Sequence, residues 1–193
     1  MIERRREHNL ETHIAFINIE KTFDSVNREL LWDILHKRGY PKHLIKVIQS
    51  MYQGTNIIIQ TDKQKTKHTI NQGVRQGCSL SPNLFNIYVD DLVRIWKDEI
   101  LTGIKIGQEQ CLNVLLFADD LVIIQNDETK LQKAVYEFYK LSQIYNFKIS
   151  KTKTKMMAFH GKFPIRTKIV IDNYILEQVS HFNYLGMDIR PYI

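Results

Sequence analysis

Two adjacent carboxylates stand out in the sequence because they lie between two short apolar runs. The segment Asn113 to Ile124 reads NVLLFADDLVII, and Asp119 and Asp120 are its only charged residues. Adjacent buried carboxylates repel each other unless they share a cation, and oxygen ligands of this kind favour Mg²⁺ or Mn²⁺. Such a site is typical of phosphoryl or nucleotidyl transfer. The alternative is a solvent-facing turn whose aspartates bond to nearby backbone amides, and this segment alone does not decide between the two.

A second pair of aspartates, Asp90 and Asp91 in NIYVDDLV, has a different setting. Apolar residues around it recur at every fourth position, which predicts an amphipathic helix opened by Ser81 and Pro82. This apolar stripe consists of Leu84, Tyr88, Leu92 and Trp96, with Phe85 and Ile95 beside it. Asp90 then lies on the far side of the stripe and Asp91 on its flank, so we interpret this pair as helix surface.

The elements before this helix follow from periodicity and from cap residues. THIAFINIE alternates and predicts a strand that ends near Glu20, and TNIIIQT with KHTINQ predicts a hairpin. Helices are predicted from a Ser25 cap through Lys37 and from Pro41 to Gly54. Their expected buried residues are Leu30, Leu31, Ile34 and Leu35 in the first helix, and Leu44, Ile45, Ile48 and Met51 in the second.

The elements after it complete a mixed pattern. NVLLF and LVII predict two buried strands joined by a tight turn, which would present both carboxylates at one edge of a sheet. A long amphipathic helix follows, and KMMAFH, TKIVI and SHFNYLGM predict further strands. The expected buried face of that helix comprises Leu131, Val135, Phe138, Leu141 and Tyr145. We therefore predict an α+β fold.

Composition narrows the class of protein. The 193 residues are 44% hydrophobic and 25% charged, which is typical of a globular domain. A net charge of +6 suits a polyanionic partner, although the lysine-rich segments 62–68 and 148–155 are equally compatible with solvated loops. We expect no membrane span or leader and an intracellular protein, nuclear or cytoplasmic. Cys78 and Cys111 are far apart, and the histidines lack metal-ligand spacing, so neither a disulfide nor a zinc site is predicted.

Three blocks in order resemble the reverse transcriptase of non-LTR (LINE-type) retrotransposons. They are AFINIEKTFDSVN, GVRQGCSLSPNLFNIYVDDL and FADD between its apolar strands. The resemblance implies a polymerase palm, an antiparallel sheet with helices packed on one face, that uses Mg²⁺ or Mn²⁺. It implies that Asp119 is the principal metal ligand with Asp120 beside it, and that the upstream YVDD belongs to a non-catalytic helix.

The resemblance also implies roles for residues outside the carboxylate pair, with an RNA template, a DNA primer and deoxynucleotides as partners. Phe23 resembles the aromatic residue under the incoming sugar that disfavours a 2′-hydroxyl, although simple packing is the alternative. Lys153 resembles the lysine near the triphosphate, a candidate general acid for pyrophosphate departure. Gln76 and Gly77 match the loop at the nascent base pair. Primer or template contacts are implied for Arg75 and for the FNYLG hairpin residues Tyr184, Leu185 and Gly186.

One position breaks the family pattern. The family's first strand carries an aspartate where this chain has Asn18, after Phe16 and Ile17. A neutral amide oxygen there holds a second metal poorly, and we expect a loss of about a thousandfold or more in rate. Glu20 points to the same side of a strand as Asn18, but its reach differs.

We expect a single palm domain over residues 1–193, in which residues 1–12 are the remnant of a preceding helix and fingers and thumb are missing. A fragment or a decayed copy of a retroelement polymerase fits this pattern. The alternatives are a non-catalytic nucleic-acid-binding remnant and an inert fragment. A viral RNA-copying palm is disfavoured by Phe23, because such enzymes have a small polar residue at that place.

Overall fold

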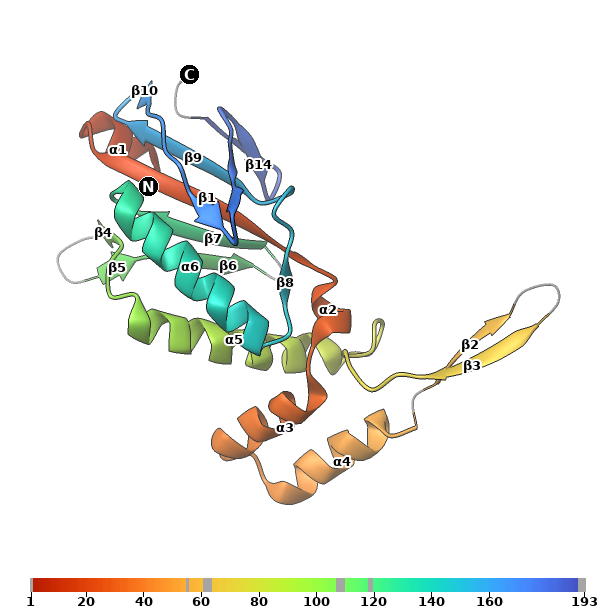
Figure 1. The fold of residues 1–193 in the computed structure, drawn as a ribbon. Coiled ribbons are helices and arrows are strands. Elements are labelled where there is room, and N and C mark those ends of the chain that lie inside the picture. Colours follow the sequence, from red (N-terminus) through yellow and green to blue (C-terminus); the bar gives the residue numbers. More distant parts are fainter. Residues whose placement is uncertain (1, 55, 61–63, 107–109, 118–119, 191–193) are drawn as a thin grey trace. The chain divides into compact units, whose positions relative to one another are not determined.

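The computed structural model describes residues 2–54, 56–60, 64–106, 110–117 and 120–190. The chain forms two compact units (Figure 1). We call Met1–Glu20, Ile95–Ile144 and Lys148–Ile193 the sheet unit, and Lys21–Arg94 with Tyr145–Phe147 the helical unit.

The sheet unit is built around one long strand, β1 (Glu11–Glu20). Its antiparallel neighbours are β7 (Asp120–Gln125) on one side and β9 (Lys155–His160) on the other, with β8 (Lys148–Ile149) pairing to its last residues. The strand order is β10-β9-β1-β7-β6, so β6 (Val114–Phe117) and β10 (Phe163–Pro164) form the edges. The mixed order of strands and helices confirms the predicted α+β class.

Smaller elements surround this sheet. The parallel partner of β9 is β13 (Glu177–Gln178). The remaining elements of the sheet unit are α1 (Ile2–Glu7), α6 (Glu128–Ile144), and the paired strands β4 (Ile104–Ile106) with β5 (Gln110–Leu112), β11 (Val170–Ile171) with β12 (Tyr174–Ile175), and β14 (Phe182–Tyr184) with β15 (Met187–Ile189).

Both faces of β1 are buried, because each face of the sheet is covered. Ile14 and Phe16 belong to one apolar cluster, against which the β14–β15 hairpin packs. Ala15 and Ile17 point to the opposite face and are equally buried. The helix α6 lies across the sheet (Figure 1) and closes that face with its buried stripe. This stripe contains Leu131, Ala134, Val135, Phe138 and Ser142.

The edge strand β6 differs from the prediction of a buried strand. Leu115 and Leu116 are each 39% exposed and Phe117 is 64% exposed, whereas Leu121 to Gln125 of β7 are all buried. Periodicity marks both segments as strands. It does not reveal which of them has a neighbour on only one side, and here that strand is β6.

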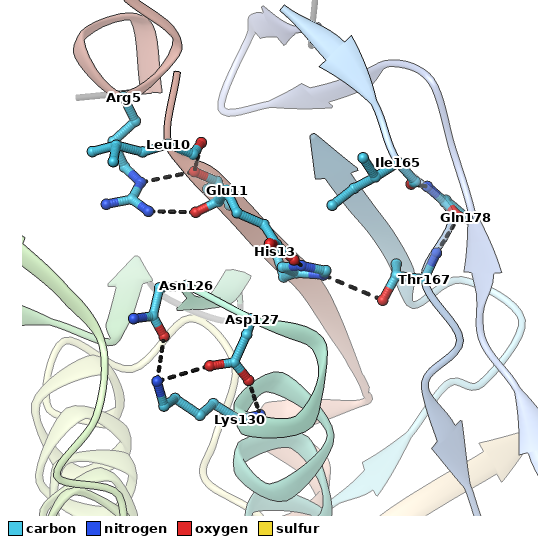
Figure 2. A network of polar contacts seen from close by, with 11 residues as sticks. Arg5, Leu10, Glu11, His13, Asn126, Asp127, Lys130, Ile165, Thr167 and Gln178 are labelled. Carbon is cyan, nitrogen blue, oxygen red and sulfur yellow. Dashed lines mark hydrogen bonds and ion pairs between the residues drawn. The ribbon is translucent and has the colours of Figure 1, made fainter. Parts of the chain in front are cut away.

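A polar network fixes the start of β1 (Figure 2). The guanidinium of Arg5 donates from Nε to Thr12 Oγ1 over 2.7 Å and also bonds to the carbonyl of Glu11. The buried His13 ring lies 2.6 Å from Glu11 Oε1 and 3.2 Å from Thr167 Oγ1. These contacts attach α1 and the segment around Thr167 to β1, far along the strand from its Asn18 end.

The helical unit contains the predicted helices with small corrections. Its helices are α2 (Thr22–Ser25), α3 (Arg28–Lys37), α4 (Lys42–Tyr52) and the larger part of α5 (Ser81–Glu99). The cap of α3 is Asn27, whose Oδ1 accepts from the Leu30 amide at 3.2 Å, so the prediction of Ser25 was wrong. In α4, Leu44 and Met51 are exposed, because the buried face follows Ile45, Ile48 and Tyr52.

A hairpin of β2 (Asn56–Gln60) and β3 (Lys65–Thr69) projects from these helices, as predicted (Figure 1). Residues 65–68 of the lysine-rich segment are therefore strand rather than loop, and they are exposed. Cys78 and Cys111 are free thiols. Within the described ranges, no helix has the length and apolarity needed to cross a membrane.

The helix α5 confirms the predicted apolar stripe, but the interpretation of both aspartates as helix surface was wrong for Asp91. Tyr88 and Leu92 are fully buried, and burial raises the pKa of the Tyr88 hydroxyl to about 12. Asp90 is exposed, whereas Asp91 is only 8% exposed and is not surface. Its carboxylate accepts a 2.6 Å hydrogen bond from Tyr145 Oη and a 3.1 Å bond from Arg94. Asp91 lies three residues after Tyr88, which rotates it toward the stripe.

Candidate active site

The register between β1 and β7 places Asn18 directly opposite Asp120. Side chains of directly opposed residues project from the same face of an antiparallel pair, with Cβ atoms about 4.5–5.5 Å apart. Phe117 is paired with Asp120 across the β6–β7 hairpin, so only two residues connect the strands, as the tight-turn prediction required. These are Ala118 and Asp119, which lie outside the described residues. The structure thus brings Asn18 and Asp120 together.

The backbone of Asn18 is held on both sides. Its amide donates to Thr154 Oγ1 at 3.1 Å, and its carbonyl accepts from the Ser150 amide at 2.8 Å. These bonds lie where β1 changes neighbours from β9 to β8. The Asn18 side chain itself makes no hydrogen bond to the described residues. The sequence analysis did not identify Thr154, which is fully buried. The only feature that could have indicated its burial is that it is an uncharged residue within the basic run KTKTK.

Lys153 lies in the turn that provides these bonds and is exposed. Its neighbours are engaged, since Lys151 pairs with Asp172 and Lys155 with Glu177, each at 2.5 Å. Within the described part of the chain, Lys153 forms no ion pair. Of the three lysines, Lys153 is therefore the one whose amine is available to a phosphate.

Glu20 points to the same side of β1 as Asn18 but has a cation partner. Its carboxylate lies 3.0 Å from Lys148 Nζ. The hydrogen bond from Lys148, together with the charges of Lys148 and Lys153, keeps the pKa of Glu20 below its usual value. Glu20 is thus an ionised carboxylate that is directed at a lysine.

The β14–β15 hairpin brings an aromatic residue close to Asp120. The Phe182 ring stacks on Phe16 with centroids 4.0 Å apart, and the Tyr184 centroid is 6.1 Å from the Phe16 centroid. Burial, and then the negative charge of Asp120, raise the pKa of Tyr184. The turn of the hairpin is formed by Leu185 and Gly186, both at positive φ. The predicted primer-contact residues therefore lie on the hairpin that borders Asp120.

In the helical unit, the segment around Phe23 pairs with the loop that carries Gln76. The Val74 amide donates to the Phe23 carbonyl at 2.8 Å, and Gln76 Nε2 donates to Asp24 Oδ1 at 3.2 Å. The half-buried Phe23 ring stacks on Phe85 with centroids 4.6 Å apart. Phe23, Gln76 and the adjacent Gly77 are thereby assembled into one group, although the stacking equally fits a packing role for Phe23.

Arg28 anchors the same loop and was missed by the sequence analysis. It is buried and donates to the carbonyls of Gly73 at 2.9 Å, Ile70 at 2.8 Å and Tyr52 at 3.3 Å. Its guanidinium lies 5.0 Å from the centroid of the Tyr52 ring, and that of Arg75 lies 5.5 Å from it. Its burial could have been inferred from helical spacing, because Arg28 precedes the buried Leu31 by three residues and Leu35 by seven and so shares their face.

Substitution of Gly73 by alanine is expected to destabilise this loop by about 2–3 kcal/mol. Gly73 has φ +80°, and an added Cβ would lie 2.9 Å from Asp24 Cα and carbonyl oxygen, so left-handed strain and a backbone clash combine. Gly77→Ala is the matched control, because Gly77 has φ +78° with open space around its Cβ and should cost only about 1 kcal/mol. Urea unfolding of both variants measures the difference, and equal losses would contradict the steric argument.

The predicted site residues therefore form two groups. The sheet unit carries Asn18, Asp120, Lys153 and the Tyr184 hairpin, and the helical unit carries Phe23, Arg75, Gln76 and Gly77. In the described residues there is no cluster of three or more histidine, cysteine, aspartate or glutamate side chains placed to hold a metal ion.

The chain is similar to known reverse transcriptases in sequence and in fold. A family model described as reverse transcriptase (RNA-dependent DNA polymerase) matches residues 2–189. The chain is 29% identical over 163 residues to a Pol polyprotein from the type-2 retrotransposable element R2DM of Drosophila melanogaster, covering 84% of this chain and 15% of the relative. It is 29% identical over 196 residues to a Pol polyprotein from the type-1 retrotransposable element R2 of Popillia japonica, covering 96% of this chain and 27% of the relative. The chain thus spans about a quarter or less of these relatives' lengths.

Among solved structures, telomerase from Candida tropicalis in complex with a fragment of telomeric RNA aligns with a TM-score of 0.68. The alignment covers 98% of this chain and 30% of the telomerase chain at 14% identity, so it shows a shared fold. The family match extends over nearly the whole chain, and the relatives are polyproteins of non-LTR elements. The chain therefore belongs to the reverse transcriptase (RNA-dependent DNA polymerase) family and is a reverse transcriptase-like domain of the non-LTR retrotransposon type.

Proposed function

We propose that the chain is the palm of an RNA-directed DNA polymerase whose nucleotidyl-transfer site comprises Asp119, Asp120 and residue 18, and that Asn18 impairs it. Reverse transcriptases copy an RNA template and use a divalent metal. The observation that supports the proposal is the pairing of Asn18 with Asp120 on the sheet face that also carries Tyr184. The side chains of Asp120 and Asn18 therefore project from one sheet face, beside an aromatic hairpin.

The donor atoms at this position suit a hard divalent cation, because they are all oxygens. Asp119 and Asp120 would hold Mg²⁺ or Mn²⁺, which would stabilise negative charge on the reacting phosphate oxygens. Asn18 adds one neutral oxygen where an aspartate would add a negative charge. The local field then attracts a second cation less strongly, so catalysis is weakened whereas the fold is retained.

The remaining residues supply positioning and proton transfer. The exposed Lys153 amine can protonate the departing pyrophosphate, since no carboxylate among the described residues holds it. Phe23 would contact the sugar of the deoxynucleotide, and Gln76 and Gly77 the base pair it forms. Arg75 would bind the template strand of RNA, and the hairpin of Tyr184, Leu185 and Gly186 would hold the end of a DNA primer.

A second candidate is nucleic-acid binding without catalysis. The net charge of +6 and the exposed lysines of β3, Lys65 and Lys67, favour it. Its signature would be binding of RNA that weakens steeply with salt and is unchanged by Asp119→Ala.

Calorimetric titration with Mn²⁺ or Mg²⁺ in the presence of a deoxynucleotide tests the first candidate. We expect saturable binding that falls at least tenfold in Asp119→Ala and in Asp120→Ala, because each removes an anionic ligand. Asp90→Ala is the control, since Asp90 is an exposed helix residue and its loss should leave the affinity unchanged. Equal affinity in all three variants would contradict the proposed site.

A further inference from the structure

A pocket in the helical unit has the chemistry of a nucleotide site. It has a volume of about 480 Å³ and lies between α3, the C-terminal end of α4 and the residues that follow β3. Its lining includes Arg28, Trp32, Gln49, Gln53 and Asn71. We propose that this pocket binds an unpaired nucleotide of single-stranded RNA, with the base stacked on Trp32. The pocket shares no residue with the proposed metal site.

The aromatic wall supplies the stacking surface. Trp32 is half-buried and meets the Tyr52 ring edge-on, with centroids 5.9 Å apart and an interplanar angle of 61°. Tyr52 is 4% exposed, and Arg28 and Arg75 lie against its ring, so its face is occupied. Trp32 is thus the ring that a base can reach. Bases of every type stack on such a ring, which makes binding tolerant of sequence.

The positive charge of Arg28, which lines the pocket, favours a phosphodiester. Arg28 is 9% exposed and bonds only to backbone carbonyls, and within the described ranges no carboxylate lies within ion-pair distance of it. A buried cation of this kind keeps a positive potential toward the opening. Glu29, which also lines the pocket, would repel a doubly charged phosphate ion. Its carboxylate can accept a hydrogen bond from the exocyclic amine of a base. A singly charged phosphodiester with its base therefore fits better than inorganic phosphate.

The amides at the mouth provide hydrogen bonds to a base edge. Gln49 and Gln53 lie four residues apart, on the same side of α4 and its end, and the exposed Asn71 follows β3. Carboxamides both donate and accept, which is what the Watson–Crick edge of an unpaired base requires. A base in a duplex has this edge occupied, so the site selects single strands.

Intrinsic fluorescence tests the proposal directly, because the chain has two tryptophans and Trp96 is fully buried. Titration of the whole chain with a short oligoadenylate should quench the Trp32 emission saturably. The same strand annealed to oligouridylate should bind at least tenfold more weakly. Free AMP, which lacks the neighbouring phosphodiesters, should also bind at least tenfold more weakly than the oligomer. Absence of saturable quenching, or equal affinity for the duplex or for AMP, would overturn the assignment.

Variants separate this pocket from general electrostatic binding. Trp32→Ala should weaken binding of a labelled oligoadenylate, followed by anisotropy, about tenfold or more, whereas Trp32→Phe should stay within about threefold. Tyr40→Ala is the control, since Tyr40 is an exposed aromatic residue of the helical unit that does not line the pocket, and its loss should leave binding unchanged. Wild-type affinity in Trp32→Ala, or equal losses in the Trp32 and Tyr40 variants, would refute the site. Asn71→Ala changes an exposed residue that lines the pocket and should weaken oligoadenylate binding about threefold. This variant tests the site if Trp32→Ala does not fold, and unchanged affinity would then refute it.

Neither test requires polymerase activity. Loss of the metal site would leave the quenching intact, and failure of the quenching would leave the metal titration unaffected. Each proposal can therefore be refuted without affecting the other.

Discussion

Substitution of Asn18 by aspartate is expected to raise the rate of primer extension about a thousandfold. The added carboxylate would lie opposite Asp120 and complete an anionic set for two cations. The measurement is extension of a DNA primer on an RNA template in the presence of Mg²⁺ or Mn²⁺. It is made in a chimaera in which this chain replaces the matching segment of an R2 polyprotein.

The same substitution has a second readout that does not depend on catalysis. Two like charges directly opposite on a sheet repel, so Asn18→Asp should lower the free energy of unfolding by about 1 kcal/mol without divalent cations. Mn²⁺ or Mg²⁺ should restore it, because cation binding stabilises only the folded chain. Asn18→Leu, which has neither charge nor amide oxygen, should gain less stability from cations than Asn18→Asp, because only Asp119 and Asp120 remain as ligands. If Asn18→Asp changes neither extension nor the response to cations, the active-site assignment fails.

Substitution of Asp91 by alanine is expected to lower the free energy of unfolding by about 3 kcal/mol. Asp91 is the buried acceptor for Tyr145 and Arg94, and a third group, Arg38, lies 3.6 Å away. Burial and the hydrogen bond to Asp91 raise the pKa of Tyr145, which keeps its hydroxyl a donor. Removal of the carboxylate leaves the buried Tyr145 hydroxyl without its acceptor and takes a nearby anion away from Arg38 and Arg94. Urea unfolding at neutral pH measures the loss.

Its neighbour in the sequence provides a close control. Asp90 is exposed and its ion pair with Arg38, at 2.8 Å, lies at the surface, so Asp90→Ala should change stability by less than about 0.5 kcal/mol. Neither substitution should alter cation binding. Similar losses for the two aspartates would contradict the buried network, and reduced cation binding in either would contradict the assignment of YVDD to a non-catalytic helix.

The fold was predictable from the sequence where periodicity was strong. The stripe from Leu84 to Trp96 identified α5, and the positive-φ Gly39 and Gly54 follow α3 and α4 as predicted. The errors occur where a local pattern has two solutions. Ser25 and Asn27 are both good caps, and tertiary contacts of α2 decided for Asn27. Asp91 was misassigned because a charged residue on the flank of a stripe is indistinguishable from surface until its partners are known.

The candidate site was predictable only in part, because its geometry depends on long-range register. The resemblance selected Asn18 and Asp120, but only the pairing of β1 with β7 places them opposite each other. Thr154 is 136 residues from Asn18 in sequence, and no local pattern connects them. Arg28 shows the same limit, since its partners are backbone carbonyls, which leave no trace in side-chain patterns.

The β6 edge of the seven-stranded sheet affects how the purified chain will behave. Among the described residues, β6 pairs with β7 alone, so the backbone groups on its other side are open to a further strand. Its leucines and Phe117 make that border apolar as well. A border of this kind recruits a strand from another copy, which leads to association as concentration rises. The isolated chain is therefore best kept at low concentration. A charged residue introduced at Leu116 would also hinder edge-to-edge pairing of β6 strands from different copies.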